Sequence, residues 1–257
     1  MSNTFTQGIF YVATGQKFIL EAQKSAASVK FYMPEVSITG YFDQPVEDKN
    51  FEQINIIDDP SFSFGDKIPP ILNPPYDHNI FLDTDVLCID DFSELFSVLD
   101  QHDLGISHCV IRDCCSKIKS APEWFPELNT GVIVFKKDST RELFKHWAEK
   151  HEEYRAIMGV GFGDQTAFRH CIYHSDIKWA VLPREYNLRP VHGWMASGHA
   201  KVKILHGRGY PVRKAIKKVN VVKHKHRGSH LKPRVGDMNS LERLYWKILR
   251  LFKLDSK

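Results

Sequence analysis

The chain has 257 residues, 42% of them hydrophobic, and a formal net charge of +4 at pH 7. This length and apolar content predict one large folded domain and argue against a disordered chain. No apolar run approaches ~18 residues, so we expect no membrane span. No basic start precedes an apolar stretch at the N-terminus, so we expect no signal peptide. The five cysteines lack metal-site spacing, and we expect reduced thiols in a cytoplasmic protein.

The first half of the chain alternates apolar strands with helices. Strands are predicted over residues 8–14, 29–33, 36–42 and 80–82, a helix over 16–28, an apolar segment over 54–57 and a helical turn over 68–72. Gly15 turns the chain between the first strand and the first helix. This β-α-β opening is typical of a parallel α/β sheet.

The second half continues the same pattern. Helices are predicted over residues 92–99, 140–154 and 165–174, strands over 104–107, 131–135, 177–182 and 202–205, and a loop over 113–126. Together with the first half, these elements predict one α/β domain over residues 1–209.

The charge is distributed unevenly along the chain. Residues 201–257 hold 17 of the 35 Lys and Arg but 3 of the 31 Asp and Glu, a balance of +14, which leaves −10 for the rest. We therefore expect a basic C-terminal extension over residues 210–257, with an amphipathic helix at 240–254. That helix suits an anionic membrane surface, which would make the protein peripheral there, and packing on the domain or a partner is the alternative.

Asp83 and Asp85 follow the strand over residues 80–82, separated by one residue. Alternate residues of a strand point the same way, and two carboxylates on one side can hold Mn²⁺ or Mg²⁺, which in turn binds a diphosphate. A solvated turn is the alternative for the pair alone. His206 ends the strand over 202–205, and a neutral imidazole can complete such a metal shell.

Two further groups carry polar side chains or glycines at element ends. Asn129, Thr130 and Gly131 offer amide and hydroxyl groups and a close backbone approach, which suit a sugar, although an ordinary turn has the same pattern. Asp164 and Gln165 open a helix, where they either cap it or contact a sugar and its developing positive charge.

Two basic residues, Lys67 and Arg208, could bind phosphate. Lys67 precedes the helical turn at residues 68–72 and is either a phosphate ligand or a solvent lysine. Arg208 lies between two glycines, Gly207 and Gly209, whose backbone N–H groups would add to its charge.

The order of these motifs resembles that of nucleotide-diphospho-sugar transferases with the GT-A fold. From about residue 8 to 209 the chain reads, in order, ATG, Lys67, FLDTDV, ELNTGVIVFKK, GDQTAF, LPREYNLRP and ILHGRG. The resemblance is strongest to the retaining, metal-dependent families that include glycogenin-like enzymes. It implies a Rossmann-like mixed sheet flanked by helices, Mn²⁺ or Mg²⁺, a nucleotide-sugar donor such as a UDP-sugar, and a glycan or lipid-linked acceptor.

The resemblance also implies a role for each motif residue. It implies metal ligation by Asp83, Asp85 and His206, nucleobase contacts from Ala13 and Thr14, donor binding by Lys67, Asp83, Asn129, Thr130, Gly131, Arg208 and Gly209, and contacts near the reacting carbon from Asp164 and Gln165. One departure stands out, because those enzymes place a lysine three residues after the glycine that matches Gly209. Position 212 is Val, and Arg213 and Lys214 are the nearest cations.

Two other function classes compete with this interpretation. A nucleotidyltransferase also uses paired aspartates, but it needs a third acidic ligand and a glycine-rich triphosphate loop, and ATGQK is poor in glycine. A nucleic-acid or anionic-surface binding protein would use the basic extension, yet residues 207–236 contain Tyr210 as their one aromatic residue. We therefore expect a glycosyltransferase without a nucleic-acid partner, and an inactive sugar-nucleotide binder remains an alternative. Since no residue is marked as a catalytic base, retention is favoured over inversion.

Overall fold

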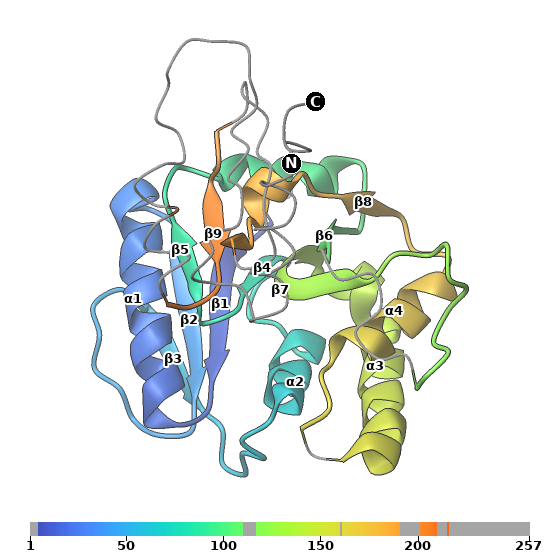
Figure 1. Cartoon of the computed structure of the whole chain (residues 1–257). Helices are drawn as coiled ribbons and strands as arrows, with labels where there is room; N and C mark the ends of the chain where they lie inside the picture. The colour runs from blue at the N-terminus through green and yellow to red at the C-terminus, as the bar shows by residue number, and fades with distance from the viewer. Residues whose placement is uncertain (1–4, 110–116, 160, 191–200, 210–214, 216–257) are drawn as a thin grey trace, which may run out of the picture.

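The protein is described by a computed structural model that covers residues 5–109, 117–159, 161–190, 201–209 and 215. Its centre is a seven-stranded sheet with the order β3-β2-β1-β4-β7-β6-β8 (Figure 1). The parallel half consists of β1 (Gln7–Ala13), β2 (Ser37–Phe42), β3 (Gln53–Ile56) and β4 (His78–Leu82). The other half consists of β7 (Leu128–Lys136), β6 (Leu104–His108) and β8 (Trp179–Val181). Because β7 runs antiparallel to both β4 and β6, the sheet is mixed, as predicted.

Helices cover both faces of this sheet (Figure 1). The helices are α1 (Gln16–Tyr32) on one face and α2 (Ile68–Leu72), α3 (Lys137–Met158) and α4 (Gln165–Tyr173) on the other. Alternate residues of β1 show why both faces are covered: Ile9 and Tyr11 pack in one core with α1, whereas Phe10 and Val12 pack in a second core with α2, α3 and α4. A strand that is apolar at every position must be buried on both sides.

Smaller elements complete the domain. A second sheet pairs β5 (Val86–Cys88) with β9 (Ile204–His206) in antiparallel orientation. The described residues also form the 3-10 helices η1 (Phe64–Lys67), η2 (Ser93–Asp100) and η3 (Arg184–Tyr186). The pairing of β5 with β9 returns a late segment of the chain to the end of β4.

Two predicted elements differ in type from the structure. The sequence predicts a strand at residues 29–33, yet α1 continues to Tyr32, because Ile19, Ala26 and Val29 extend one buried helical face and the Met33 N–H donates to the Val29 carbonyl. The helix predicted at residues 92–99 is present as the 3-10 helix η2.

The aspartate pair lies in the connection between β4 and β5, where the prediction placed it at a strand end. Asp83 and Asp85 follow β4, and the Val86 N–H donates to the Asp83 carbonyl at 3.3 Å, which turns the chain. The Asp83 N–H donates to the Gly131 carbonyl at 2.8 Å. The two carboxylates are therefore presented by a turn that is hydrogen-bonded to β7. The expectation that they share one side of a strand does not describe this turn.

The basic extension over residues 210–257, including the helix predicted at 240–254, lies outside the described residues apart from residue 215. The boundary at residue 209 therefore stays a prediction. Within the described part of the chain, every helix is too short or too polar to span a membrane.

Candidate functional site

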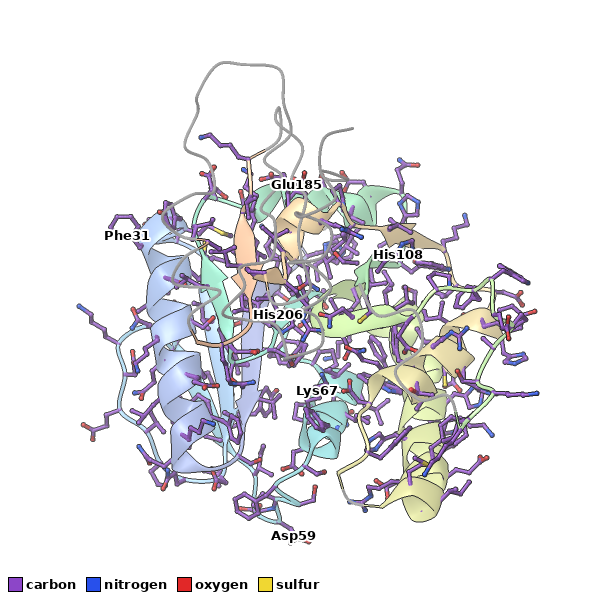
Figure 2. All side chains as sticks on the ribbon, in the orientation of Figure 1. Phe31, Asp59, Lys67, His108, Glu185 and His206 are labelled. Carbon is purple, nitrogen blue, oxygen red and sulfur yellow. The ribbon has the colours of Figure 1, made fainter. Side chains whose placement is uncertain are left out.

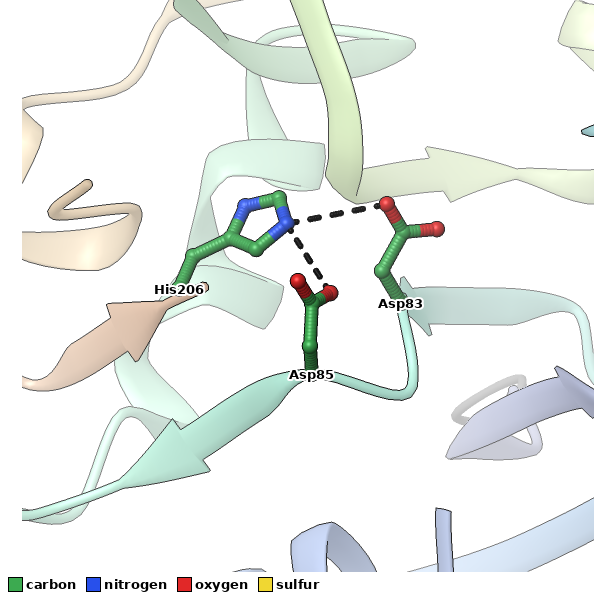
Figure 3. A group of neighbouring side chains, drawn as sticks. All are labelled: Asp83, Asp85 and His206. Carbon is green, nitrogen blue, oxygen red and sulfur yellow. Dashed lines mark ion pairs between the residues drawn. The ribbon is translucent and has the colours of Figure 1, made fainter. Parts of the chain in front are cut away.

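Asp83, Asp85 and His206 converge at the end of β4 (Figure 3). His206 Nε2 lies 3.2 Å from Asp85 Oδ1 and 3.7 Å from Asp83 Oδ2. The β5–β9 register sets His206 opposite Val86, the residue after Asp85, and so brings the ring to the carboxylates. Two carboxylate oxygens and one ring nitrogen, mutually within 4.8 Å, are a donor set that fits a divalent cation.

The two carboxyl groups of this site have different environments. Burial raises the pKa of Asp83, and the opposing charges of Lys67 and His206 do not cancel that effect. Burial also acts upward on the pKa of Asp85, but the hydrogen bond and charge of His206, with the charge of Arg208, lower it to about 2. Asp85 is thus the carboxylate whose negative charge is held most firmly.

Lys67 is buried beside this group and ties it to α4 (Figure 2). Its Nζ lies 3.0 Å from Asp164 Oδ2, 3.3 Å from Asp83 Oδ1 and 3.2 Å from Thr130 Oγ1. Burial lowers the pKa of Lys67, but the charges of Asp164 and Asp83 outweigh it, and the net direction is upward. The Thr130 hydroxyl donates to the same Asp164 oxygen at 2.5 Å. Lys67 is therefore a shared cation between two acidic groups, in contrast to a solvent lysine.

Side-chain amides connect the sugar-type residues to the histidine. Asn129 Nδ2 donates to Gln165 Oε1 at 2.8 Å, and Asn187 Nδ2 donates to Asn129 Oδ1 at 2.8 Å. The Asn187 Oδ1 in turn lies 2.8 Å from His206 Nδ1. Asn187 is not among the predicted site residues, although it lies in the LPREYNLRP motif. Its place in that motif is the one sequence signal that could have indicated it.

Gly131 fits a position where a side chain has no room. A Cβ at this residue would lie 2.2 Å from His206 Cε1 and 2.7 Å from Asp83 Oδ2. The close approach predicted for this glycine is therefore an approach to the site's own side chains.

Arg208 lies at the outer side of Asp85. Its Nη1 is 3.1 Å from Asp85 Oδ2, and its Nη2 is 2.7 Å from Glu21 Oε2. The guanidinium group also lies over the Phe18 ring, 5.4 Å from the centroid. Glu21 is a second residue that sequence reasoning missed, because a glutamate in mid-helix carries no motif.

No protein-family model and no curated protein sequence matches the chain. Its fold does match solved structures. The galactosyltransferase LgtC, in a complex with donor and acceptor sugar analogs, matches with a TM-score of 0.57 at 17% identity, over 84% of this chain and 98% of that one. An active-site mutant of LgtC matches with a TM-score of 0.56 at 16% identity, with the same coverage. The chain has the GT-A fold. The fold predicted from the order of the motifs is thereby confirmed.

In this GT-A sheet, the residues predicted to contact a nucleobase lie at the end of β1. Thr14 Oγ1 donates to Asp66 Oδ2 at 2.7 Å, and the Gly15 N–H donates to Asp43 Oδ1 at 3.0 Å. Gly15 has φ of +93°, which a residue with a side chain rarely adopts. Asp66 precedes Lys67 in η1, so one short helix joins the β1 end to the acidic group.

The GT-A fold thus assembles nearly all of the predicted residues in one place. A continuous set of contacts joins Lys67, Asp83, Asp85, Asn129, Thr130, Gly131, Asp164, Gln165, His206 and Arg208. Ala13 and Thr14 lie at the β1 end, where the Thr14 hydroxyl bonds to Asp66 of η1. Gly209, with φ of +78°, directly follows Arg208.

Proposed function

We propose that the chain is a metal-dependent glycosyltransferase that moves a hexose from a UDP-sugar to a glycan or lipid-linked acceptor, with retention of configuration. The observation that carries the proposal is the Asp83–Asp85–His206 group, joined through Lys67 to Asp164, in a chain with the GT-A fold. LgtC, which shares this fold, is a galactosyltransferase described with donor and acceptor sugar analogs, and this supports the same reaction class here.

The departing group in this reaction is a diphosphate, on which negative charge accumulates. Mn²⁺ or Mg²⁺ held by Asp83, Asp85 and His206 would supply Lewis-acid stabilisation of that charge when bound. Arg208 adds a guanidinium beside Asp85, suited to phosphate oxygens. Lys67 keeps a positive charge between Asp83 and Asp164, so that neither acidic group lacks a counter-charge.

The sugar carbon that loses its leaving group becomes electron-poor. Asp164 and Gln165 at the start of α4 offer a carboxylate and an amide oxygen to such a centre. The Asp164 carboxylate already contacts Lys67 and Thr130, an arrangement suited to electrostatic support and poorly suited to removing a proton from an acceptor. An inverting enzyme needs such a base, and this consideration favours retention.

The remaining parts of the proposal concern the two ends of the donor and the acceptor. Ala13 and Thr14 at the end of β1 would contact the uracil and ribose, with Asn129, Thr130 and Gly131 on the sugar side. The basic extension over residues 210–257 would bring the cytoplasmic enzyme to an anionic membrane that carries a lipid-linked acceptor. Co-sedimentation with phosphatidylserine vesicles, with and without residues 239–257, tests this last part.

A thermal-shift screen tests the core of the proposal. Binding to the native state raises the melting temperature, and a ligand at 100 times its Kd adds about 2.7 kcal/mol. UDP with Mn²⁺ is expected to raise the melting temperature, and UDP with a chelator is expected to have no such effect. Failure of every nucleoside diphosphate to shift the melting temperature would refute the donor site. A shift without turnover of any UDP-sugar would instead indicate an inactive sugar-nucleotide binder.

A further inference from the structure

One backbone N–H fixes the orientation of two buried amides in this site. The Gly131 N–H lies 3.3 Å from the Oδ1 atom of Asn129. A backbone N–H can only donate, so the Asn129 atom that faces it must be the oxygen. The Nδ2 group of Asn129 is therefore directed to Gln165, whose Oε1 accepts at 2.8 Å.

The same reasoning passes to the next amide. Asn187 faces the Asn129 oxygen at 2.8 Å, so the Asn187 atom at this contact must be the donor Nδ2. Its remaining atom, Oδ1, then faces His206 Nδ1 at 2.8 Å. An amide oxygen can only accept, so His206 Nδ1 has to carry a proton.

We infer that Asn187 is a positioning residue that sets the tautomer of His206. With Nδ1 committed to Asn187 as a donor, Nε2 is the ring atom that faces Asp83 and Asp85, where a cation would bind it. The role toward a cation rests on the proposed function, whereas the tautomer does not.

The relay formed by Asn129, Asn187 and His206 is buried. Asn187 is 6% exposed, and both Asn129 and His206 are 3% exposed. A buried polar network depends on its own members for hydrogen bonds, because water reaches it poorly. Removing the Asn187 amide would thus leave His206 Nδ1 without its acceptor, and the ring would favour a proton on Nε2, where Asp85 Oδ1 lies 3.2 Å away.

The relay also links the two chemical ends of the site. Asn129 contacts both Asn187 and Gln165. One side chain therefore orients Asn187, which faces His206, and Gln165, which is proposed to face the sugar. Asn129→Asp separates the two effects: a carboxylate still accepts from Gly131 and Asn187, but it cannot donate to Gln165.

The test is ¹⁵N NMR of the histidine side chains in ion-free full-length protein at about pH 8. Nδ1 of the wild-type His206 ring is expected to carry a proton, whether or not Nε2 also shares one with Asp85. Asn187→Leu, of similar size, is expected to leave the proton on Nε2 alone and to weaken Mn²⁺ binding by about 10- to 100-fold. Asn187→Asp and Asn129→Asp, which each preserve an acceptor in the relay, are expected to keep the proton on Nδ1.

Several outcomes would overturn the inference. A wild-type Nδ1 without a proton refutes it directly, and this measurement needs no variant and no metal. An unchanged tautomer in a folded Asn187→Leu protein refutes it as well. If Asn187→Leu does not fold, loss of the Nδ1 proton in Asn187→Asp gives the contrary result. Absence of Mn²⁺ binding by the wild type would count against the proposed function and leave the tautomer measurement intact.

Discussion

Lys67 and Asp164 form an ion pair of 3.0 Å between two side chains that are almost completely buried. The pair joins η1 to the residue before α4, and Lys67 extends it to Asp83. A buried charge that loses its partner is costly, since the protein interior solvates it poorly. This pair is therefore the point at which the fold and the proposed chemistry depend on one another.

Replacing Lys67 by methionine is expected to lower the free energy of unfolding by about 3–5 kcal/mol, because two acidic groups lose their shared cation. Denaturant unfolding measures the change. Lys145→Met, on the exposed side of α3, is the control and is expected to change the value by less than about 0.5 kcal/mol. The double variant Lys67→Met with Asp164→Asn should recover part of the loss, and strictly additive losses would contradict a direct pairing.

Asp85→Asn is expected to remove the Mn²⁺-dependent part of UDP binding and to reduce transfer by on the order of 10³-fold, since several kcal/mol of charge stabilisation are lost. Thermal shift with UDP and Mn²⁺, followed by a transfer assay, checks both effects. Asp59→Asn makes the same chemical change at an exposed position far from His206 (Figure 2) and should behave as wild type. Full turnover by the Asp85 variant would exclude Asp85 as a ligand.

Arg208→Gln is expected to weaken UDP binding about tenfold and to leave uridine binding unchanged, because a charge-assisted hydrogen bond to phosphate is worth about 1.5–3 kcal/mol. Glu21→Gln should also weaken UDP binding and leave uridine binding unchanged, with a smaller effect. This substitution weakens the 2.7 Å contact that holds the Arg208 guanidinium in place. Calorimetric titration with both ligands distinguishes the cases. Lys203→Gln, a charge change next to β9, is the matched control. Equal losses for UDP and uridine would indicate a structural role instead.

Asp66→Asn is expected to lower stability at pH 7 by roughly 1 kcal/mol, the usual value of a helix-capping group. Burial acts upward on the pKa of Asp66, but hydrogen bonds from Ser61 and Thr14 outweigh it and lower the pKa. A pKa lower in the folded than in the unfolded protein gives stability that is present at neutral pH and is lost as the pH falls below about 4. Melting curves from pH 7 to pH 3 should show the gap between wild type and variant closing, and a constant gap would contradict the assignment.

Gly131→Ala is expected to destabilise the protein by about 1–3 kcal/mol and to abolish Mn²⁺ binding, since the new methyl group would overlap the His206 ring. Gly161→Ala is the control, because a Cβ at that position meets no atom within 4 Å. Isothermal titration with Mn²⁺ and a melting curve measure both effects. Retained Mn²⁺ affinity in the Gly131 variant would show that the ring can move without harm to its ligand role.

Local patterns predicted the groups that sit at element ends. Asp83 and Asp85 directly follow an apolar strand and His206 ends another apolar segment, so two carboxylates and an imidazole at strand ends could be predicted as one metal-binding set. The partners of these residues could not be predicted in the same way. Asn187 contacts His206, which lies 19 positions away in the sequence, and Glu21 contacts Arg208, which lies 187 positions away. No local pattern marks such contacts.

The misassigned segment has a related cause. Residues 29–33, VKFYM, are rich in β-branched and aromatic residues, which favour a strand when read alone. In the folded chain Val29 completes the buried face begun by Ile19, and that packing outweighs the local preference. The burial of Lys67 likewise depends on Asp83 and Asp164, which approach it only in the tertiary structure.

The pairing of β5 with β9 has a consequence for the order of assembly. Val86 and His206 are partners across 120 positions of sequence, so both aspartates leave the ribosome long before the histidine that faces them. Closing so long a loop costs conformational entropy, and the short strands of this sheet offer few hydrogen bonds in return. A divalent ion bound by Asp83, Asp85 and His206 would stabilise the pairing of β9 with β5. On that basis the nascent protein becomes competent for its proposed chemistry only after β9 has been synthesised.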